Sequence, residues 1–573
     1  MIGETYNPLE RFENEFKDSF QRNASVYFDE LVKKSGVDAE LNRRLVNEYK
    51  ALTAEAEAAD RKHSWLVFWV VVLVFALITS GITAFYGFGE EENGFIFLWI
   101  VGTLFSIMLL ITSVRAMKKV KALRDEKRQA AEQKKDEAMQ QMASLNRLYT
   151  WDIAARIFEK TVPDIHFDRF SNEARFSQFV QEFGWSGQFD EDSSILFAQS
   201  GELADNPFAF CRLLSMYWGT ETYTGSITIH WTTRERSSDG KYYTRHHSEV
   251  LTASVTKPKP EYYHRALLIY GNEAAPHLNF KRECSGLAQA GDGFFGSLKV
   301  RHERKKLEKL SRNLTDNSNY TMMANKEFET LFNTMDRDNE VDFRIMFTPM
   351  AQLQMTQLLK NTAVGYGDDF SFKKMNKINV IESKHLNETD LDTCPTRFVN
   401  FDLEESRKFF LDWNCQLFKS LYFTMAPILA IPVYMQTLPQ SKLQAYPELA
   451  LNSANIWECE ALANYMGESK FAHPKSITHN ILKVNDVKHA DGVGSISVVA
   501  HGHYTQKHTE YVSKFGGDGK IHTIPVNWLE YIPISRESNF TIREMPGEDE
   551  LQVRKKCQPS EIFRRNIIAF FRK

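Results

Sequence analysis

The sequence predicts an α+β protein: a two-helix transmembrane hairpin with helical arms, followed by cytoplasmic domains around a mixed or antiparallel sheet. Three observations predict this fold. Two apolar runs without a charge, 65–86 and 94–114, each match the roughly 20 residues that an α-helix needs to cross a bilayer. Polar, helix-forming segments flank both runs. From about residue 148 onward, alternating strand patterns mix with helical ones.

These patterns divide the chain into five segments. Residues 1–60 form a cytoplasmic helical N-terminal segment, and 64–114 hold the transmembrane hairpin. Residues 115–147 form a helical arm. The rest divides into a cytoplasmic α+β module at 148–390 and a cytoplasmic α+β C-terminal region at 391–573. At 573 residues, the chain is long enough for several domains with large cores.

Charge and cysteine content exclude some classes of protein. The formal net charge of -4 gives no global attraction to nucleic acid, so no nucleic-acid partner is expected. The 6 cysteines are scattered and form no Cys-x-x-Cys pair. That spacing argues against a zinc ribbon or a disulfide framework and suits a reducing compartment. No cofactor is expected from any motif in the chain.

The charges around the hairpin predict its orientation. Arg61 and Lys62 precede the first run, and the loop between the runs carries acidic residues at 90–92 and no cation. A basic cluster follows the second run: Arg115, Lys118, Lys119, Lys121 and Arg124. The positive-inside rule then predicts a multi-pass plasma-membrane protein with both termini in the cytoplasm. Neither run holds an ionisable residue, which leaves an oligomeric channel or transport component as the least favoured reading.

The flanking arms carry apolar residues at helical spacing amid Lys, Glu and Gln. We expect them to extend the membrane helices as an antiparallel pair in the manner of a coiled coil; the alternative is one solvated connecting helix. Phe12, Phe16 and Phe20 recur at steps of four, as on one face of a short helix. This face is expected to pack on the arms or on the main domain.

Several elements are predicted in the soluble region. Alternation at 227–232, a polar turn at 237–240 and a return through Val255 predict a β-hairpin. A strand is predicted at 341–347. Thr348 and Pro349 then begin a helix, and another strand includes 370–372. The apolar run 421–435 contains two prolines and is too short to span a membrane, so it is predicted to be a buried core segment.

Part of this region resembles a known family. The stretch 327–359 combines an F-x-x-x-F segment, an acidic turn and a T-P helix start, namely Phe328 and Phe332, Asp336 and Asp338, and Phe347-Thr348-Pro349. It is similar to bacterial membrane proteins that share the domain of unknown function numbered thirty-one thirty-seven, over residues 150–385. The resemblance implies a membrane hairpin followed by a cytoplasmic module. That family has no known activity, so it implies no catalytic residue.

The candidate metal ligands are His501 and His503, which share one face of a predicted strand while His508 lies on the other. An H-x-H pair holds zinc only with a third ligand, which the sequence does not identify. The alternative is the solvent face of a hairpin with a Gly-rich tip at 516–519. The catalytic residues stay unknown.

Three further motifs give weaker indications of function. The G-x-G-x-x-G at 291–296 lacks a preceding strand, so a dinucleotide site is not expected there. The basic run 299–312 is interpreted as a solvated helix face. The C-terminal stretch 562–573 mixes aromatic and basic residues. It is either a short helix on the bilayer or a segment docked on the domain.

Together the patterns predict a two-span bacterial membrane protein whose large cytoplasmic region acts as an interaction or scaffold domain. Its expected partners are the lipid bilayer and either another protein or further copies of the same chain. The alternative is a membrane-tethered enzyme, metal-dependent or hydrolytic, with its site near His501 and His503.

Overall fold

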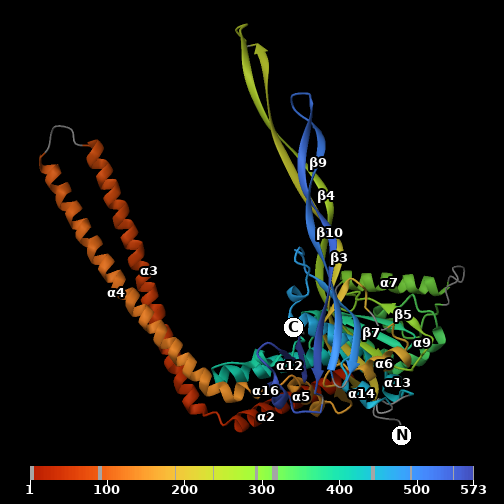
Figure 1. Cartoon of the computed structure of the whole chain (residues 1–573). Helices are drawn as coiled ribbons and strands as arrows, with labels where there is room; N and C mark the ends of the chain where they lie inside the picture. Colours follow the sequence, from red (N-terminus) through yellow and green to blue (C-terminus); the bar gives the residue numbers. More distant parts are fainter. Residues whose placement is uncertain are drawn as a thin grey trace. The chain divides into compact units, whose positions relative to one another are not determined.

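The structure is a computed structural model that describes residues 6–87, 93–186, 189–236, 238–290, 294–312, 320–440, 446–490, 493–545 and 547–571. Its elements are shown in Figure 1. The chain forms two compact units. The larger unit comprises 1–24, 150–394 and 414–573, and the smaller comprises 25–149 and 395–413. The predicted regions 148–390 and 391–573 thus both contribute to the larger unit.

The smaller unit is built on two long helices, α3 (Ala39–Gly87) and α4 (Asn93–Asn146). They pair antiparallel, and ion pairs connect them: Lys134 of α4 lies 3.2 Å from Glu48 of α3, and Lys127 of α4 lies 2.7 Å from Glu55 of α3. Buried alanines such as Ala59 and Ala138 allow the two backbones to approach closely. The two predicted apolar helices and their helical arms are therefore present. The acidic loop at 90–92 lies outside the described residues.

Polar contacts hold the end of the helical arms that lies away from the apolar stretches. Lys50 on α3 pairs with Asp402 at 2.9 Å, just before α12 (Leu403–Leu429) begins. Arg407 on α12 pairs with Asp29 on α2 (Lys17–Ser35) at 2.5 Å. The hydroxyls of Tyr149 and Ser406, both buried, lie 3.0 Å apart. The end of the arm is therefore held by side chains distant in sequence.

The larger unit contains two antiparallel sheets, which confirms the α+β prediction. The first has seven strands, in the order β1 (Ile165–Phe167), β2 (Ser193–Leu203), β3 (Asn206–Arg236), β4 (Tyr242–Gly271), β7 (Ile378–Ser383), β6 (Phe370–Met375) and β5 (Asn279–Arg282). The second has five, in the order β11 (Ile562–Arg564), β12 (Ile567–Phe570), β10 (Ile521–Glu544), β9 (Val493–Phe515) and β8 (Ile481–Ala490).

Helix α15 (Ile456–Met466) lies between the two sheets. Its residues Leu462 and Met466 belong to one apolar core with Val498 and Ile542 of the five-stranded sheet. Its residue Trp457 belongs to a second core, which includes residues of β2, β3 and β4. A helix that is apolar on nearly all sides is expected where both faces are covered, and α15 fits that pattern.

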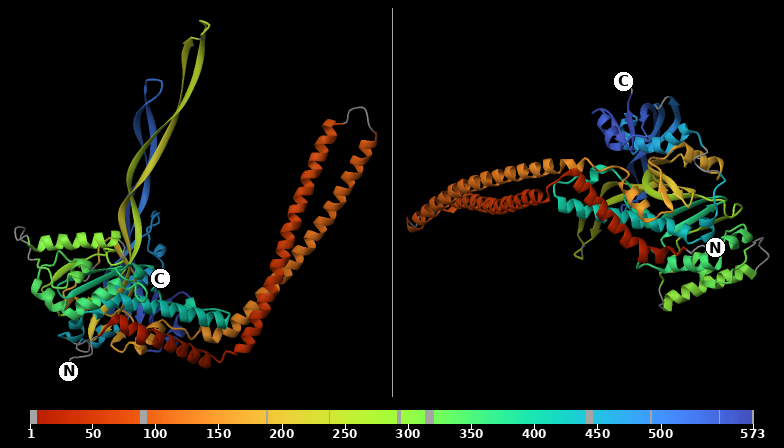
Figure 2. Two further views of the ribbon diagram at one scale, coloured as in Figure 1. Left: turned by 180° about the vertical axis from the view of Figure 1, so that it is seen from behind. Right: turned by 90° about the horizontal axis from the view of Figure 1, so that it is seen from below.

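Two hairpins extend beyond the sheets and stack on each other as a double-layered ribbon (Figures 1 and 2). They are β3–β4 and β9–β10, and the described parts of the predicted turns, 238–240 and 516–519, are at their tips. Ile229 and Leu251 of the first hairpin pack against Ile524 and Val526 of the second. The side chains that face away from this layer are solvent-exposed, as expected from the period of two along a strand.

The N-terminal aromatic face packs on the main unit, as predicted. Residues of α1 (Pro8–Arg11), the π-helical turn η1 (Phe12–Phe16) and the start of α2 form this face. The ring of Phe20 stacks on that of Phe418 at 4.0 Å, and Phe12 lies 4.8 Å from Phe423. Both partners lie on α12, which also contains the buried run from Leu421 onward.

The remaining helices cover the sheets or connect their strands. They are α5 (Ile153–Thr161), α6 (Glu173–Gln181), α7 (Phe294–Arg312), α8 (Lys326–Phe332), α9 (Glu340–Met346), α10 (Pro349–Lys360), α11 (Lys384–Glu388), α13 (Pro432–Gln436), α14 (Glu448–Asn452) and α16 (Glu550–Lys556), with 3-10 turns at Pro395–Phe398 and Glu468–Lys470. Thr348 caps α10 by accepting from the N–H of Ala351, as predicted.

The strand predicted at 341–347 is wrong, because these residues form helix α9. The side chain of Asn339 caps the helix by accepting two backbone N–H groups. Phe343 and Met346 are buried, whereas Val341 and Ile345 are more than half exposed. Buried residues that lie three positions apart are typical of a helix. The alternation of apolar and polar residues in the sequence had indicated a strand instead.

The helix considered for the C-terminal stretch is also absent from the described part of that stretch, which docks on the unit as β11 and β12. Arg565 and Asn566 connect the two strands with positive φ angles of 48° and 61°. Two left-handed residues are what a two-residue hairpin turn of type I′ requires. Ile567, Ile568 and Ala569 are fully buried, so they are not available to a bilayer.

Candidate functional site

The smaller unit exposes an apolar band around α3 and α4. Both helices are long and apolar enough to cross a membrane, and none of their most apolar stretch is buried inside the protein. Trp65 is 63% exposed, Phe75 68% and Met108 65%. Soluble proteins rarely expose contiguous apolar patches of this extent. The backbone of both helices is internally hydrogen-bonded, as a hydrocarbon environment demands.

Exposed cations mark the boundary of the band on the side of the arms. Arg61 and Lys62 on α3, and Lys118 and Lys119 on α4, are all solvent-exposed. Farther along the arms, the charges are paired: Arg124 of α4 lies 3.0 Å from Asp60 of α3. The helices therefore change from an uncharged surface to a charged one within a few residues.

His501 and His503 line one cavity of about 620 Å³, in the larger unit. Both lie on β9, where they pair with Ser535 and Pro533 of β10. His501 is exposed, whereas His503 is 5% exposed and its ring meets that of Trp218 edge-on at 5.2 Å. Burial lowers the pKa of both imidazoles, so they are neutral at pH 7.

The metal prediction for this pair stays a prediction. Within the described part of the chain, no three His, Cys, Asp or Glu side chains are grouped so as to hold a metal ion. His508 stacks on Trp528 and lies 2.8 Å from Glu530. It therefore takes part in a separate contact farther along the hairpin.

Glu460 of α15 also lines this cavity and is almost completely buried. Burial raises its pKa to about 7, although Lys483 and two backbone N–H groups oppose the shift. These N–H groups, of Ile195 and Val484, donate to its two carboxylate oxygens at 2.7 and 3.2 Å. Because Ile195 belongs to β2 and Val484 to β8, Glu460 connects the two sheets.

The other sequence candidates have structural roles. His247 stacks on Trp231 and hydrogen-bonds Thr233 at 2.7 Å within the β3–β4 hairpin. The basic run 299–312 is part of helix α7, which is mostly exposed apart from Leu307. The first three residues of the G-x-G-x-x-G motif lie outside the described residues.

A cluster of buried charges was missed by the sequence analysis. Glu458 on α15 is fully buried and pairs with Arg564 at 2.8 Å and Arg565 at 3.4 Å, both of which are 2% exposed. Burial lowers the pKa of Arg565 to about 10. The carboxylate and the guanidinium groups are about a hundred residues apart in the chain. No local sequence pattern could have joined them.

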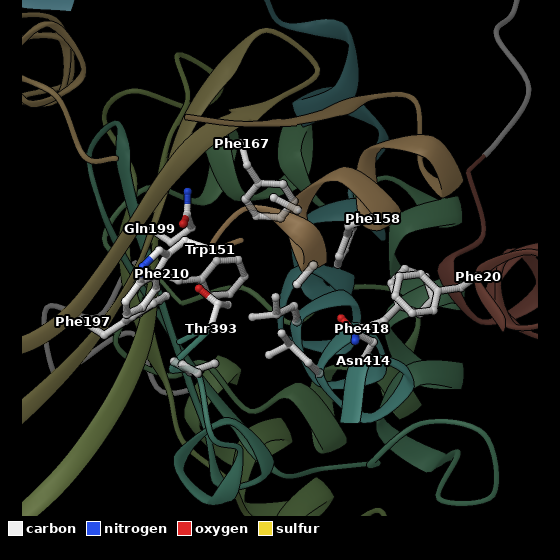
Figure 3. A pocket seen from close by; sticks show the side chains of 15 residues that line it. Phe20, Trp151, Phe158, Phe167, Phe197, Gln199, Phe210, Thr393, Asn414 and Phe418 are labelled. Carbon is white, nitrogen blue, oxygen red and sulfur yellow. The ribbon is translucent and has the colours of Figure 1, made fainter. Parts of the chain in front are cut away.

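A small apolar cavity lies under the N-terminal aromatic face (Figure 3). Its volume is about 40 Å³, and its walls include Phe20, Phe158, Phe197 and Phe418. Gln199, Thr393 and Asn414 add polar groups to these walls (Figure 3), but the small volume leads us to interpret the cavity as a packing defect of the core.

Comparison with known proteins finds no relative of this chain. No family model, curated protein or solved structure matches the chain. The resemblance over residues 150–385 therefore stays a prediction.

Proposed function

We propose that this is a bacterial plasma-membrane protein anchored by α3 and α4, whose cytoplasmic α+β unit binds another protein or a second copy of itself. The observation that carries the proposal is the exposed apolar band on the two helices. In water, an apolar surface costs about 25 cal/mol for each Å² exposed, and a bilayer removes this cost. Helices are also one of the two structures that satisfy their backbone inside a bilayer.

The charge pattern supports an orientation with both arms in the cytoplasm. The exposed cations Arg61, Lys62, Lys118 and Lys119 lie at the same end of the antiparallel pair. Positively charged residues close to membrane helices stay on the cytoplasmic side. Since the arms lead into the larger unit in the chain, that unit is cytoplasmic as well.

The β ribbon supports the interaction part of the proposal. At the tip of β9–β10, Phe515 and Ile521 form a cross-strand pair and are 67% and 69% exposed. Tyr511 on the same face is 69% exposed. Exposed aromatic and aliphatic side chains that share a face are typical of protein interfaces. The tip projects away from both sheets (Figure 2), so a partner can reach it.

Capture with the full chain in mild detergent tests the interaction. The variant Phe515→Ser/Ile521→Ser removes the apolar pair, and Ser513→Ala/Thr523→Ala is the matched control, since this pair lies next to it on the same face. We expect the wild type and the control to retain the same partner, or to self-associate, and the tip variant to lose it. Equal capture by all three would contradict an interface at the tip.

The rival proposal is a membrane-tethered, metal-dependent or hydrolytic enzyme. The observation that favours it is the position of His501 and His503 at one cavity. Metal analysis of the purified chain separates the two proposals. Stoichiometric zinc that disappears in His501→Ala/His503→Ala would establish the metal site and refute a purely scaffolding role.

A further inference from the structure

The cavity at His503 lies between the two sheets of the larger unit. Met216 and Tyr262 contribute from the seven-stranded sheet, Val499 and Pro533 from the five-stranded sheet, and Trp457 from α15. Its volume of about 620 Å³ is within the range of small-molecule sites. It is therefore much larger than the packing defect in Figure 3.

The walls are aromatic. Trp218, Tyr262 and Trp457 line the cavity together with Phe189, whose ring lies 5.8 Å from that of Trp457. Trp218 is 48% exposed, so a large part of its ring surface is uncovered. Flat aromatic side chains bind flat rings by stacking and edge contacts.

Among the lining side chains that are almost completely buried, two have a polar atom without a hydrogen-bond partner in the described part of the chain. These atoms are Nδ1 of His503 and Nε1 of Trp457, on side chains that are 5% and 1% exposed. Buried polar groups are normally hydrogen-bonded, and each exception needs an explanation. The indole N–H is a donor, and the imidazole nitrogen either donates or accepts according to its tautomer. A ligand with both kinds of group would satisfy them.

The charged residues that line the cavity disfavour a ligand that carries a phosphate group. Glu191 and Asp192 are exposed lining residues. The one lysine of the lining, Lys483, donates to the carbonyl oxygen of Ser193 at 2.8 Å and lies 3.8 Å from Glu460. The two exposed carboxylates repel an anion, and the lysine already has acceptors.

We propose that this cavity binds a small planar heteroaromatic compound without a phosphate, of the nucleobase or nucleoside class. Trp218 and Tyr262 contact the ring, and His503 and Trp457 hydrogen-bond its polar edge. The proposal does not depend on the membrane anchor, since every residue that it uses belongs to the larger unit.

Titration of the full chain in detergent with adenosine tests the proposal, by calorimetry and by ligand-observed magnetic resonance. We expect saturable binding of adenosine and at least tenfold weaker binding of its 5′-monophosphate. Trp218→Ala and His503→Phe should weaken adenosine binding at least tenfold; the second keeps a ring and removes the nitrogen. The control Trp528→Ala removes a half-buried tryptophan on the same ribbon and should bind as the wild type does.

Circular dichroism and thermal unfolding identify any variant that fails to fold. If Trp218→Ala does not fold, the affinity of the His503→Phe variant for adenosine decides the outcome alone. Absence of binding to adenosine, or unchanged binding in the folded variants, would overturn the proposal. Equal affinity for the monophosphate would also overturn it, because the exposed carboxylates would then not select the ligand.

Discussion

The α3–α4 pair and the β ribbon are both long hairpins, but they differ in how far their apolar side chains are buried. The ribbon buries many of its apolar residues between its two layers, so that Ile524 and Val526 are 0% exposed, and it exposes others at its tip, such as Phe515 and Ile521. Its outward face carries exposed hydroxyl side chains, among them Thr224, Ser226, Thr228, Thr252 and Ser254. In the helix pair, by contrast, every residue at 65–82 and 100–114 is exposed or partly exposed. The outward face of the ribbon therefore suits water, whereas the uncovered apolar stretch of the helix pair is what the proposed membrane anchor requires.

The largest expected effect comes from charging the apolar band. Val72→Arg/Phe75→Arg places two cations near the middle of the apolar stretch of α3. Each arginine at the centre of a membrane helix costs about 3 kcal/mol for insertion, so the pair costs about 6 kcal/mol. We expect alkaline carbonate to extract the variant from membranes but not the wild type. Leu41→Arg, on the arm, is the control and should stay in the pellet; extraction of the wild type would refute the anchor.

The second largest effect tests whether the buried ion pairs of Glu458 stabilise the larger unit. Glu458→Ala leaves Arg564 and Arg565 buried without their carboxylate. Removing one partner of a buried ion pair costs about 3–5 kcal/mol of unfolding free energy. The matched control is Glu561→Ala, whose partner Arg543 is 38% exposed in its side chain and should lose about 1 kcal/mol or less. Thermal unfolding measures both, and equal losses would contradict this account of the cluster.

The third effect depends on pH. Burial lowers the pKa of Lys374, on β6, to about 7, while in the unfolded chain it is near 10.5. Between these values the unfolded state binds the extra proton, so stability rises with pH. Lys374→Met removes this dependence. From pH 7 to pH 9, the wild type should gain about 2 kcal/mol relative to the variant, as chemical denaturation will measure. A constant difference would mean that the lysine is charged in the folded protein.

The smallest effect concerns the stacking of the two hairpins. A methyl group on Gly225 of β3 would lie 2.2 Å from the carbonyl oxygen of Pro525 on β10. Gly225→Ala therefore forces the layers apart, at a cost of about 1–3 kcal/mol. Gly219→Ala, on the same strand, meets only the flexible side chain of Glu261 and should cost less. Thermal unfolding of the two variants compares them; equal shifts would show that the layers are not in close contact.

The sequence predicted those parts of the fold whose signal is local. The two apolar helices, the two hairpin turns and the cap at Thr348 each depend on neighbouring residues, and the structure has them all. The full length of the ribbon was missed, because alternation continues on an exposed strand without any change of pattern. Helix α9 was mistaken for a strand because Val341 and Ile345 alternate with polar residues although both are exposed.

The candidate site was predicted only in part. Sequence spacing put His501 and His503 on one strand face, and both line one cavity. Their aromatic neighbours Trp218, of the seven-stranded sheet, and Trp457, of α15, both precede them in the chain by more than forty residues. Such a juxtaposition exists only after folding, so no pattern along the chain could have indicated it.

Cysteine labelling tests the central claim, that α3 and α4 cross the membrane with the larger unit inside, most directly. The native Cys284, Cys415 and Cys557 are all partly exposed and serve as internal controls. A membrane-impermeant maleimide is applied to intact cells that carry one further cysteine at position 89. The account predicts labelling at position 89 alone, and labelling of Cys557 only after lysis. Labelling of the native cysteines in intact cells, or no labelling of position 89, would contradict it.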